Sequence, residues 1–256
     1  MRIGIVGAMP QETGLLEREL TDAHPQRRGM RDYLEGTMYG KDVVLVFSRM
    51  AKVAAASTVT TLIEAFGVDQ VIFTGVAGAA DPALNVGDVV VGTVLVQHDL
   101  DARPLFRHFE VPLLNRVGFE APHGLVSLAR QSAEEYLHNR LADDLSVETL
   151  REFGIEAPPQ VHEGLIISGD QFIANAATLA SLQRSLQEEG LPLAKCVEME
   201  GAAVAQVCHE HQVPLIIIRT ISDRADHTAA VDFVPFVDKV ASHFTSGIVK
   251  ELISRV

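Results

Sequence analysis

Four charged residues stand at the ends of apolar segments that are typical of buried strands. Glu200 follows a mostly apolar approach, Arg219 and Asp223 follow an uninterrupted apolar run, and Glu12 comes shortly after an apolar N-terminal stretch. Ligands bind at the carboxyl ends of strands in open α/β sheets, so these four side chains are expected to share one site. Carboxyl groups in such a site can donate a proton, activate a water molecule or stabilise a developing positive charge.

Strand and helix patterns alternate around these four positions. Apolar runs predict strands over residues 2–6, 69–73, 89–96, 160–167, 191–197 and 214–218, with a hairpin over 33–39 and 42–47. Helical spacing predicts helices over residues 10–20, 52–66, 124–141, 146–153, 175–189 and 232–253, and another after Glu200. The pattern predicts one α/β domain over residues 1–256, a three-layer sandwich whose central, mostly parallel sheet has helices on both faces.

Two local expectations accompany this fold. Residues 21–31 are polar and are expected to form a surface connection. The helix over 52–66, which Gly67 should end, is expected to place Val53, Ala56, Thr60 and Ile63 on one face.

Composition excludes several classes of partner. The 256 residues carry a formal net charge of −13, which opposes binding to nucleic acid or to an anionic membrane. No apolar segment approaches the roughly 18 residues that a membrane-spanning helix needs. Cys196 and Cys208 lie in apolar segments, which favours free thiols, a reducing compartment and hence a cytoplasmic location.

No cofactor or metal site is predicted. The glycines at 4 and 7 lack the G-x-G-x-x-G spacing of a dinucleotide site. The run 208–211 is rich in potential ligands, but neighbouring residues of a helix point to different faces. His98 and Asp99 are better explained by a hydrogen bond in a loop than by a metal.

Five motifs occur in an order and at intervals that resemble one enzyme family. They are residues 1–10 with Glu12, 74–88, 168–170 with Phe172 and Ile173, 197–200, and 219–223. Together they resemble the 5′-methylthioadenosine/S-adenosylhomocysteine nucleosidases of the purine nucleoside phosphorylase superfamily, except in parts of residues 100–160. The resemblance implies a mixed, partly barrel-like sheet. It also implies hydrolysis of the N-glycosidic bond of either nucleoside, which releases adenine and the 5′-thio-ribose in methionine salvage.

The resemblance gives each of the four charged residues a role in a reaction whose transition state is like an oxocarbenium ion. Asp223 would donate a proton to purine N7, and Glu12 would hold and activate the water molecule. Glu200 would accept hydrogen bonds from the ribose hydroxyls and place negative charge near the cation, while Arg219 would help to hold the water. Taken singly, the acids are equally typical of helix caps and dipole partners, and Arg219 of a buried ion pair.

The resemblance also assigns the remainder of a pocket. Phe172 would stack on the purine, Met199 would lie under the ribose, and Met50 and Phe233 would line an apolar space for the 5′ substituent. The implied substrate-binding residues are Met9, Met50, Ala77, Gly78, Phe172, Ile173, Val197, Met199, Glu200, Ser222 and Phe233. A homodimer is implied, with the partner covering the 5′ end of the pocket, and the apolar segment 105–114 suits that contact.

This sequence departs from the family pattern at several positions, so the resemblance does not specify which 5′ substituent the substrate carries. Val76 stands where Ser or Thr is usual, and Arg49 brings a cation near the 5′ pocket, where we expect it to contact a carboxylate of the substrate. Residues 142–161 are longer than expected, and Glu198 is interpreted as a structural ion-pair partner. A futalosine-type nucleosidase would share the same acids. A phosphorylase would need a basic anion site that Glu12 opposes, and a non-catalytic binding protein would have no reason to keep the three acids together.

Overall fold

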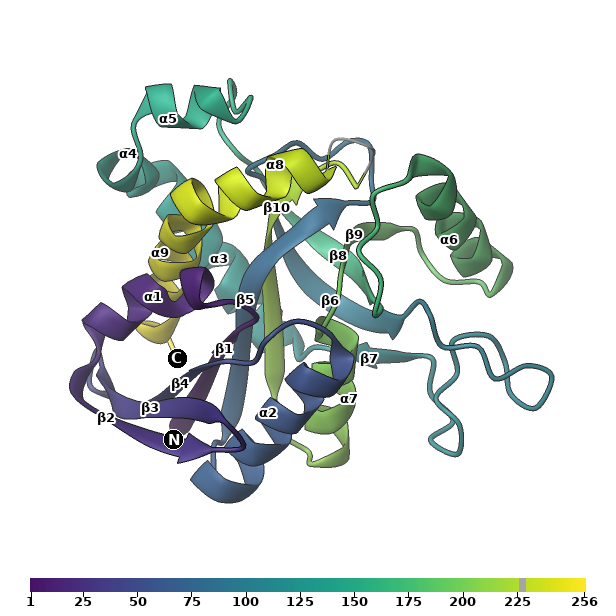
Figure 1. Ribbon diagram of the computed structural model, residues 1–256, viewed down its shortest axis with the longest axis horizontal. Coiled ribbons are helices and arrows are strands. Elements are labelled where there is room, and N and C mark those ends of the chain that lie inside the picture. The colour runs from purple at the N-terminus through teal and green to yellow at the C-terminus, as the bar shows by residue number, and fades with distance from the viewer. Residues whose placement is uncertain (226–228) are drawn as a thin grey trace.

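The computed structural model describes residues 1–225 and 229–256 (Figure 1). The strands are β1 (Arg2–Gly7), β2 (Thr21–Arg28), β3 (Arg31–Met38), β4 (Lys41–Phe47), β5 (Gln70–Ala79), β6 (Val89–Gln97), β7 (Gly118–Glu120), β8 (Val161–Ser168), β9 (Ala194–Glu198) and β10 (Leu215–Asp223). The helices are α1 (Pro10–Glu19), α2 (Lys52–Phe66), α3 (His123–Asn139), α4 (Leu141–Asp144), α5 (Val147–Glu152), α6 (Ala176–Glu188), α7 (Gly201–Glu210), α8 (Ala229–Phe236) and α9 (Ser242–Ile253), with a π-helical turn η1 (Val237–Ala241) between the last two. The predicted alternation of strands and helices is therefore confirmed.

The strands form one mixed sheet that closes partly on itself. Their order is β10-β6-β8-β9-β5-β1-β4-β3-β2, with β7 on β6, and β10 also pairs with β5. The strands β5, β10, β6, β8 and β9 consequently form a closed ring, from which β1, β4, β3 and β2 extend.

The prediction of a mostly parallel sheet is wrong for the described residues. Five strand pairings are parallel and five are antiparallel. Tight turns join β2 to β3 and β3 to β4, and closing the ring sets β10 against β6 and β9 against β5 in opposite directions. Apolar periodicity identifies a strand but carries no information about the direction of its neighbours.

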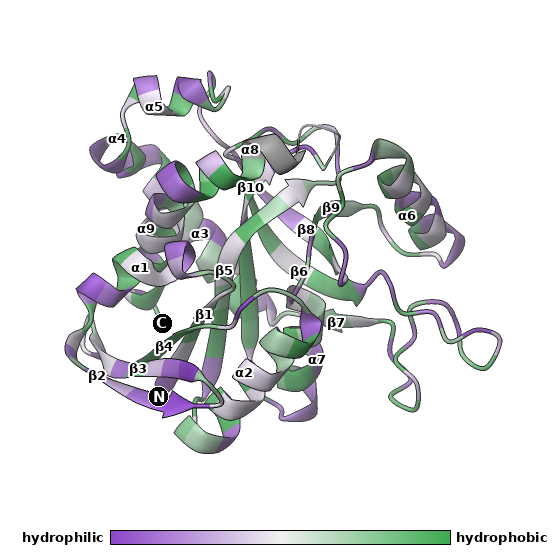
Figure 2. Cartoon of the chain, viewed as in Figure 1, coloured by the Kyte–Doolittle hydropathy of each residue, from purple (hydrophilic) through white to green (hydrophobic). Residues whose placement is uncertain are grey.

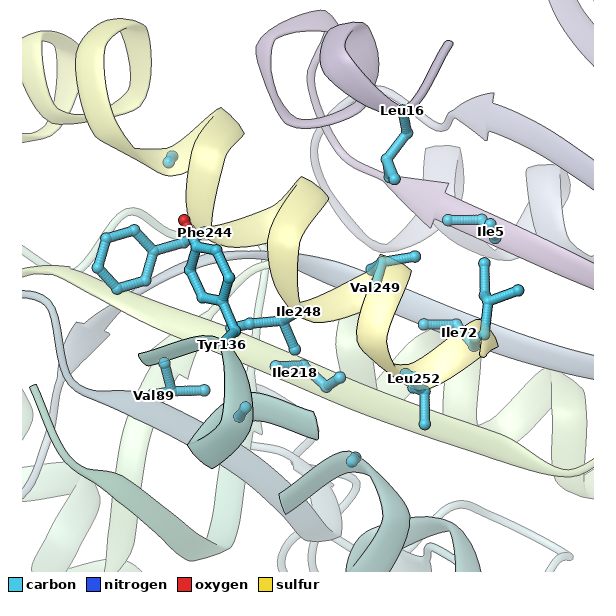
Figure 3. Close-up of a cluster of buried hydrophobic side chains, with 14 of the residues drawn as sticks. Ile5, Leu16, Ile72, Val89, Tyr136, Ile218, Phe244, Ile248, Val249 and Leu252 are labelled. Atoms are coloured by element: carbon cyan, nitrogen blue, oxygen red, sulfur yellow. The ribbon is translucent and has the colours of Figure 1, made fainter. Parts of the chain in front are cut away.

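Helices cover both faces of the sheet. The contacts of α1 and α3 with α9 place these three on one face, and α2 packs with α7 on the other (Figure 1). Figure 3 shows Ile248 of α9 beside Ile218 of β10, and Phe244 of α9 beside Tyr136 of α3. Burying each such side chain contributes roughly 1.5–3 kcal/mol, so this layer holds α9 firmly on the sheet.

Residues 21–31 correct the expectation of a surface connection. Most of them form β2, which pairs only with β3 at the edge of the sheet and is largely exposed. Figure 2 accordingly shows β2 as one of the most hydrophilic strands. Backbone hydrogen bonds rather than burial define this strand, so the apolar pattern gave no signal for it.

Helix α2 has the predicted bounds but buries a different face. Its buried residues are Ala55, Thr58, Val59, Leu62 and Phe66, whereas Val53 is 81% exposed. Small and apolar residues occupy both faces of α2, so the spacing of apolar residues alone could not show which face is buried. Gly67 ends the helix with φ of 63°, as predicted.

The extra segment within residues 142–161 braces the C-terminal helices. Phe153 packs edge-to-face on Phe236 with ring centroids 5.7 Å apart, and Glu152 pairs with Lys239 at 2.9 Å. The predicted single helix over 232–253 is interrupted here, because Pro235 lies inside α8 and η1 follows.

Cys196 and Cys208 are both buried and free, as predicted. Within residues 1–225 and 229–256, no helix has the length and apolar character to cross a bilayer.

Candidate active site

A pocket of about 390 Å³ is lined by residues at the carboxyl ends of β1, β5, β9 and β10 and by Phe233 of α8. Its volume is within the usual range for a small-molecule site. It is lined by Ala8, Met9, Glu12, Met50, Val76, Ala77, Gly78, Gln171, Phe172, Ile173, Val197, Glu198, Met199, Glu200, Ser222, Asp223 and Phe233. Glu12, Glu200 and Asp223, far apart in the sequence, thus face one cavity.

Glu12 is held rigidly at the first turn of α1. Its Oε2 atom accepts hydrogen bonds from the backbone N–H groups of Ala8 at 2.6 Å and Met9 at 2.9 Å. Its Oε1 atom accepts one from the N–H of Val76 at 3.2 Å. Burial raises the pKa of Glu12, although the Arg219 guanidinium and these three N–H groups act in the opposite direction. A carboxylate with a raised pKa is a better proton acceptor near neutral pH.

Gly75 explains how Glu12 and Arg219 approach each other. A Cβ atom at this position would lie 2.5 Å from Oε1 of Glu12 and 2.9 Å from Nη1 of Arg219. The φ of Gly75 is also 153°, which an L side chain rarely adopts. Only glycine therefore fits between the acid and the guanidinium.

Arg219 lies beneath the pocket rather than in its lining, and its main partner is Glu198. Its Nη2 atom is 2.5 Å from Oε2 of Glu198 and 3.9 Å from Oε2 of Glu200. Its guanidinium also stands over the ring of Phe73, 4.3 Å from the centroid. The expected ion pair of Glu198 is therefore present, and Glu198 rather than Glu200 takes the shorter contact.

Glu198 also fastens the start of α7. Its carboxylate accepts hydrogen bonds from the backbone N–H of Gly201 at 2.9 and 3.0 Å and of Glu200 at 3.2 Å. The Ser168 hydroxyl donates to the same carboxylate.

The carboxyl group of Glu200 lies close to the carboxyl groups of Glu198 and Glu12. Its Oε1 atom accepts a hydrogen bond from the backbone N–H of Ala51 at 2.8 Å. Burial, followed by the nearby charge of Glu198, raises the pKa of Glu200 to about 8. Glu12, Glu198 and Glu200 all lie near the guanidinium of Arg219. Retention of a proton by one of these carboxyl groups lowers the electrostatic repulsion between them.

Asp223 is placed by an irregularity in the pairing of β10 with β5. The register shifts between Ile221 and Asp223, and this brings Asp223 opposite Gly78. Its Oδ2 accepts a hydrogen bond from the Ser222 hydroxyl at 2.8 Å, and its Oδ1 accepts one from the Ala225 N–H at 2.8 Å. A Cβ atom at Gly78 would lie 2.9 Å from Oδ1, so glycine makes room for the carboxyl group.

The outer part of the pocket is apolar. Phe172 and Phe233 meet edge-to-face with centroids 5.6 Å apart. Phe172 is 46% exposed and Met50 is 54% exposed, so both lie at the rim. Among the residues that the structure describes, none that lines the pocket is a lysine, arginine or histidine.

Arg49 corrects one expectation. Its guanidinium donates a hydrogen bond to the carbonyl oxygen of Met30 at 3.0 Å, and Arg49 is not part of the pocket lining. Arg49 has φ of 70°, a backbone conformation that sequence alone does not reveal.

Some pocket residues were not predicted as substrate contacts. Ala8 and Gln171 line the cavity beside predicted residues, so adjacency in the sequence was the available signal. Ala51 contributes only a backbone N–H, for which no residue type gives a signal. No cluster of potential metal ligands is present in the described parts of the chain.

Comparisons with known proteins identify the family of this chain. The family model of the phosphorylase superfamily matches residues 2–254. The 5′-methylthioadenosine/S-adenosylhomocysteine nucleosidase of Bacillus cytotoxicus is 36% identical over 253 residues, which cover 98% of each chain. The chain belongs to this nucleosidase family.

Solved structures of the family have the same fold. The 5′-methylthioadenosine/S-adenosylhomocysteine nucleosidase of Neisseria meningitidis, in complex with methylthio-immucillin-A, superimposes with a TM-score of 0.85 at 31% identity, covering 100% of this chain and 99% of that one. The futalosine hydrolase of Helicobacter pylori strain 26695 gives a TM-score of 0.83 at 31% identity, covering 100% and 98%. Since nucleosidases named for different substrates are equally similar in fold, the pocket must distinguish between their substrates.

Proposed function

We propose that this chain hydrolyses the N-glycosidic bond of 5′-methylthioadenosine and S-adenosylhomocysteine, releasing adenine and the 5′-thio-ribose. The observation that carries the proposal is that Glu12, Glu200 and Asp223 line one pocket, and that Arg219, which is outside the lining, makes its shorter contact with Glu198. The three acids therefore face the same space.

Each acid supplies one part of the reaction. Asp223 donates a proton to purine N7, which makes the base a better leaving group. Glu12, anchored by three backbone N–H groups, accepts a proton from the water that attacks the anomeric carbon. Glu200 accepts hydrogen bonds from the ribose hydroxyls and, once ionised, stabilises the ribosyl cation.

No single residue provides the whole rate enhancement. General acid or base catalysis contributes about 10²–10⁴, which is about 3–5 kcal/mol. The remainder comes from electrostatic stabilisation by fixed charges and from holding the purine and sugar in register. Phe172 and Ile173 hold the purine, Met9 and Met199 hold the ribose, and Met50 and Phe233 hold the 5′ substituent.

Water is favoured over phosphate as the attacking group. Four acids, Glu12, Glu198, Glu200 and Asp223, line the pocket, and no basic residue does among those described. A phosphate dianion would be repelled there, whereas a neutral water molecule would not.

The apolar rim favours a thioether over an anionic 5′ group. Met50 and Phe233 form this end of the pocket, and Arg49 donates a hydrogen bond to the β2–β3 turn instead. The carboxylate of S-adenosylhomocysteine is balanced by the ammonium group of the same 5′ substituent. A futalosine-type substrate, which is the alternative, carries a carboxylate with no such partner, and the described lining offers no cation to balance it.

We also propose an oligomeric state, a domain organisation, a cellular location and a metabolic role for the protein. The exposed Leu105 and Leu113 of the segment 105–114 support a homodimer in which this segment reaches the partner's 5′ pocket. Residues 1–256 would act as one catalytic domain, which a family match over residues 2–254 supports. Two free thiols favour the cytoplasm, and release of adenine from methylthioadenosine would serve methionine salvage.

A substrate panel tests the proposal. The rate of free-base release is measured in phosphate-free buffer with methylthioadenosine, S-adenosylhomocysteine, adenosine, inosine and futalosine. Adenine release from the two thio-nucleosides without phosphate is expected. Release that requires phosphate would identify a phosphorylase, and preferred cleavage of futalosine would identify the alternative nucleosidase.

A further inference from the structure

The start of α2 is bonded to two separate parts of the proposed site. The backbone N–H of Ala51 donates to Oε1 of Glu200 at 2.8 Å, at the ribose end. The next N–H, of Lys52, donates to Oδ1 of Asp170 at 2.8 Å. Asp170 directly precedes Gln171 and Phe172 of the pocket lining, so one turn of backbone touches both the sugar and the purine ends.

Lys52, Asp99 and Asp170 form a closed triangle of hydrogen bonds. The Lys52 ammonium donates to Oδ1 of Asp99 at 2.7 Å, and the Asp170 N–H donates to Oδ2 of Asp99 at 2.9 Å. The Lys52 N–H completes the triangle at Asp170. It joins the start of α2, the segment after β6 and the loop after β8, three segments that are far apart in the sequence.

Two members of the triangle, Lys52 and Asp99, are partly shielded, whereas Asp170 is exposed. The side chains of Lys52 and Asp99 are only 17% and 22% exposed, and the Lys52 ammonium also donates to Oε1 of Gln97 at 3.1 Å. A Cβ atom at Gly169 would lie 3.0 Å from Cγ of Asp99, so the loop after β8 lies directly against it. Although burial alone would raise it, the pKa of Asp99 lies below its usual value because Lys52 and the Asp170 N–H stabilise its charge.

We propose that Lys52 is a positioning residue, whose ammonium locks the Ala51–Glu200 contact to the loop that carries Phe172 and so sets the spacing between the ribose and purine ends of the pocket. The inference rests on the proposed nucleosidase function for its kinetic consequences. Lys52 itself does not line the pocket and therefore acts only through Glu200 and the loop after β8.

The test compares Lys52→Met, which keeps the apolar stem but removes the charge, with wild-type protein. A shift of about 1 Å in a positioned group can cost on the order of 100-fold, so kcat/KM for methylthioadenosine is expected to fall by about that factor. The dissociation constant of adenine, measured by calorimetry, is expected to rise at least about tenfold, because the purine loop is released. Asp99→Asn should have a similar effect, and the double variant should be no worse than either single variant.

Lys250→Met is the matched control, since the Lys250 ammonium pairs with Glu19 at 3.3 Å on a distant face. It should leave kcat/KM and adenine affinity unchanged. A merely structural role for Lys52 would lower kcat in proportion to folded protein and leave adenine affinity as in wild type; that result, or multiplying effects in the double variant, would overturn the inference. Absence of adenine release by wild-type protein would instead refute the proposed function, while the adenine affinities would still test the role of Lys52.

Discussion

Ala51 donates its backbone N–H to the carboxylate of Glu200 from a conformation that side chains rarely adopt. The hydrogen bond is 2.8 Å long, and Ala51 has φ of 78° and ψ of 161°. This region of backbone space is essentially restricted to glycine and costs on the order of 1–3 kcal/mol for other residues. The contacts with Glu200 and Asp170 hold the loop in place against that cost.

Ala51→Gly is therefore expected to stabilise the protein. Glycine lowers the free energy of unfolding by roughly 0.4–1 kcal/mol, because it gives the unfolded chain more conformational freedom. Relief of the backbone strain should exceed this loss, so the free energy of unfolding should rise by about 1 kcal/mol. The Tm should rise by about 2–4 °C, with activity retained because the N–H remains. Ala56→Gly, in the regular part of α2, is the control and should lower the free energy of unfolding by about 0.5–1 kcal/mol. Equal losses of stability in the two variants would show that the backbone at Ala51 is not strained.

The raised pKa of Glu200 should make stability depend on pH. Burial raises the pKa of Glu200 to about 8 in the folded protein from its ordinary value of 4.5, so the folded state binds the proton more tightly. Stability from this group is complete below about pH 4.5 and is lost as the pH rises toward 8, by at most about 1.4 kcal/mol per pH unit. Glu200→Gln removes this loss, so its Tm should exceed that of wild type increasingly from about pH 5 to about pH 8. Parallel Tm profiles for the two proteins would show that Glu200 does not hold the proton.

Ligand binding should release that proton. Ribose hydroxyls that donate to Glu200 favour its ionised form, so the pKa of Glu200 should fall when a nucleoside binds. Calorimetry with a non-hydrolysable methylthioadenosine analogue, in two buffers of different ionisation enthalpy near pH 7, should detect release of a fraction of one proton. Adenine, which has no ribose, and the Glu200→Gln variant should release much less. Equal release by analogue and adenine would place the titrating group elsewhere.

Gly247 is predicted to be essential to the packing of α9 on α3. A Cβ atom there would overlap the ring of Tyr136, whose hydroxyl is bonded to Asp144 at 3.1 Å. Helix propensity favours alanine by about 1 kcal/mol, but overpacking of this kind costs typically about 1–3 kcal/mol and here should dominate. Gly247→Ala should therefore unfold at lower denaturant concentration than wild type. Gly14→Ala in α1, where a Cβ atom meets nothing within 4 Å, should unfold at a higher one; the same sign for both would refute the packing argument.

The sequence predicted best those features that depend on burial or on acids at strand ends. Apolar runs located the central strands because their side chains are enclosed on both sides, as Ile216 and Ile217 are. β2 and the buried face of α2 were missed because backbone pairing defines the first, and small residues on both faces obscure the second.

Contacts made by the main chain were beyond sequence reasoning. The N–H groups of Ala51 and Val76 that bind Glu200 and Glu12 could have come from any residue type. The direction of Arg49 depends on its positive φ, which the residue type does not indicate. Arg219 lies closer to Glu198, at 2.5 Å, than to Glu200, at 3.9 Å, and only the fold sets these two distances.

The central claim is that Glu12 and Asp223 perform hydrolysis in one pocket. The most direct test is adenine release from methylthioadenosine in phosphate-free buffer by wild type, Glu12→Gln, Asp223→Asn and, as an exposed control, Asp101→Asn. The two pocket variants should each lose about 10²–10⁴ in kcat, and the control should match wild type. Near-wild-type kcat in either pocket variant, with folding intact, would contradict the account.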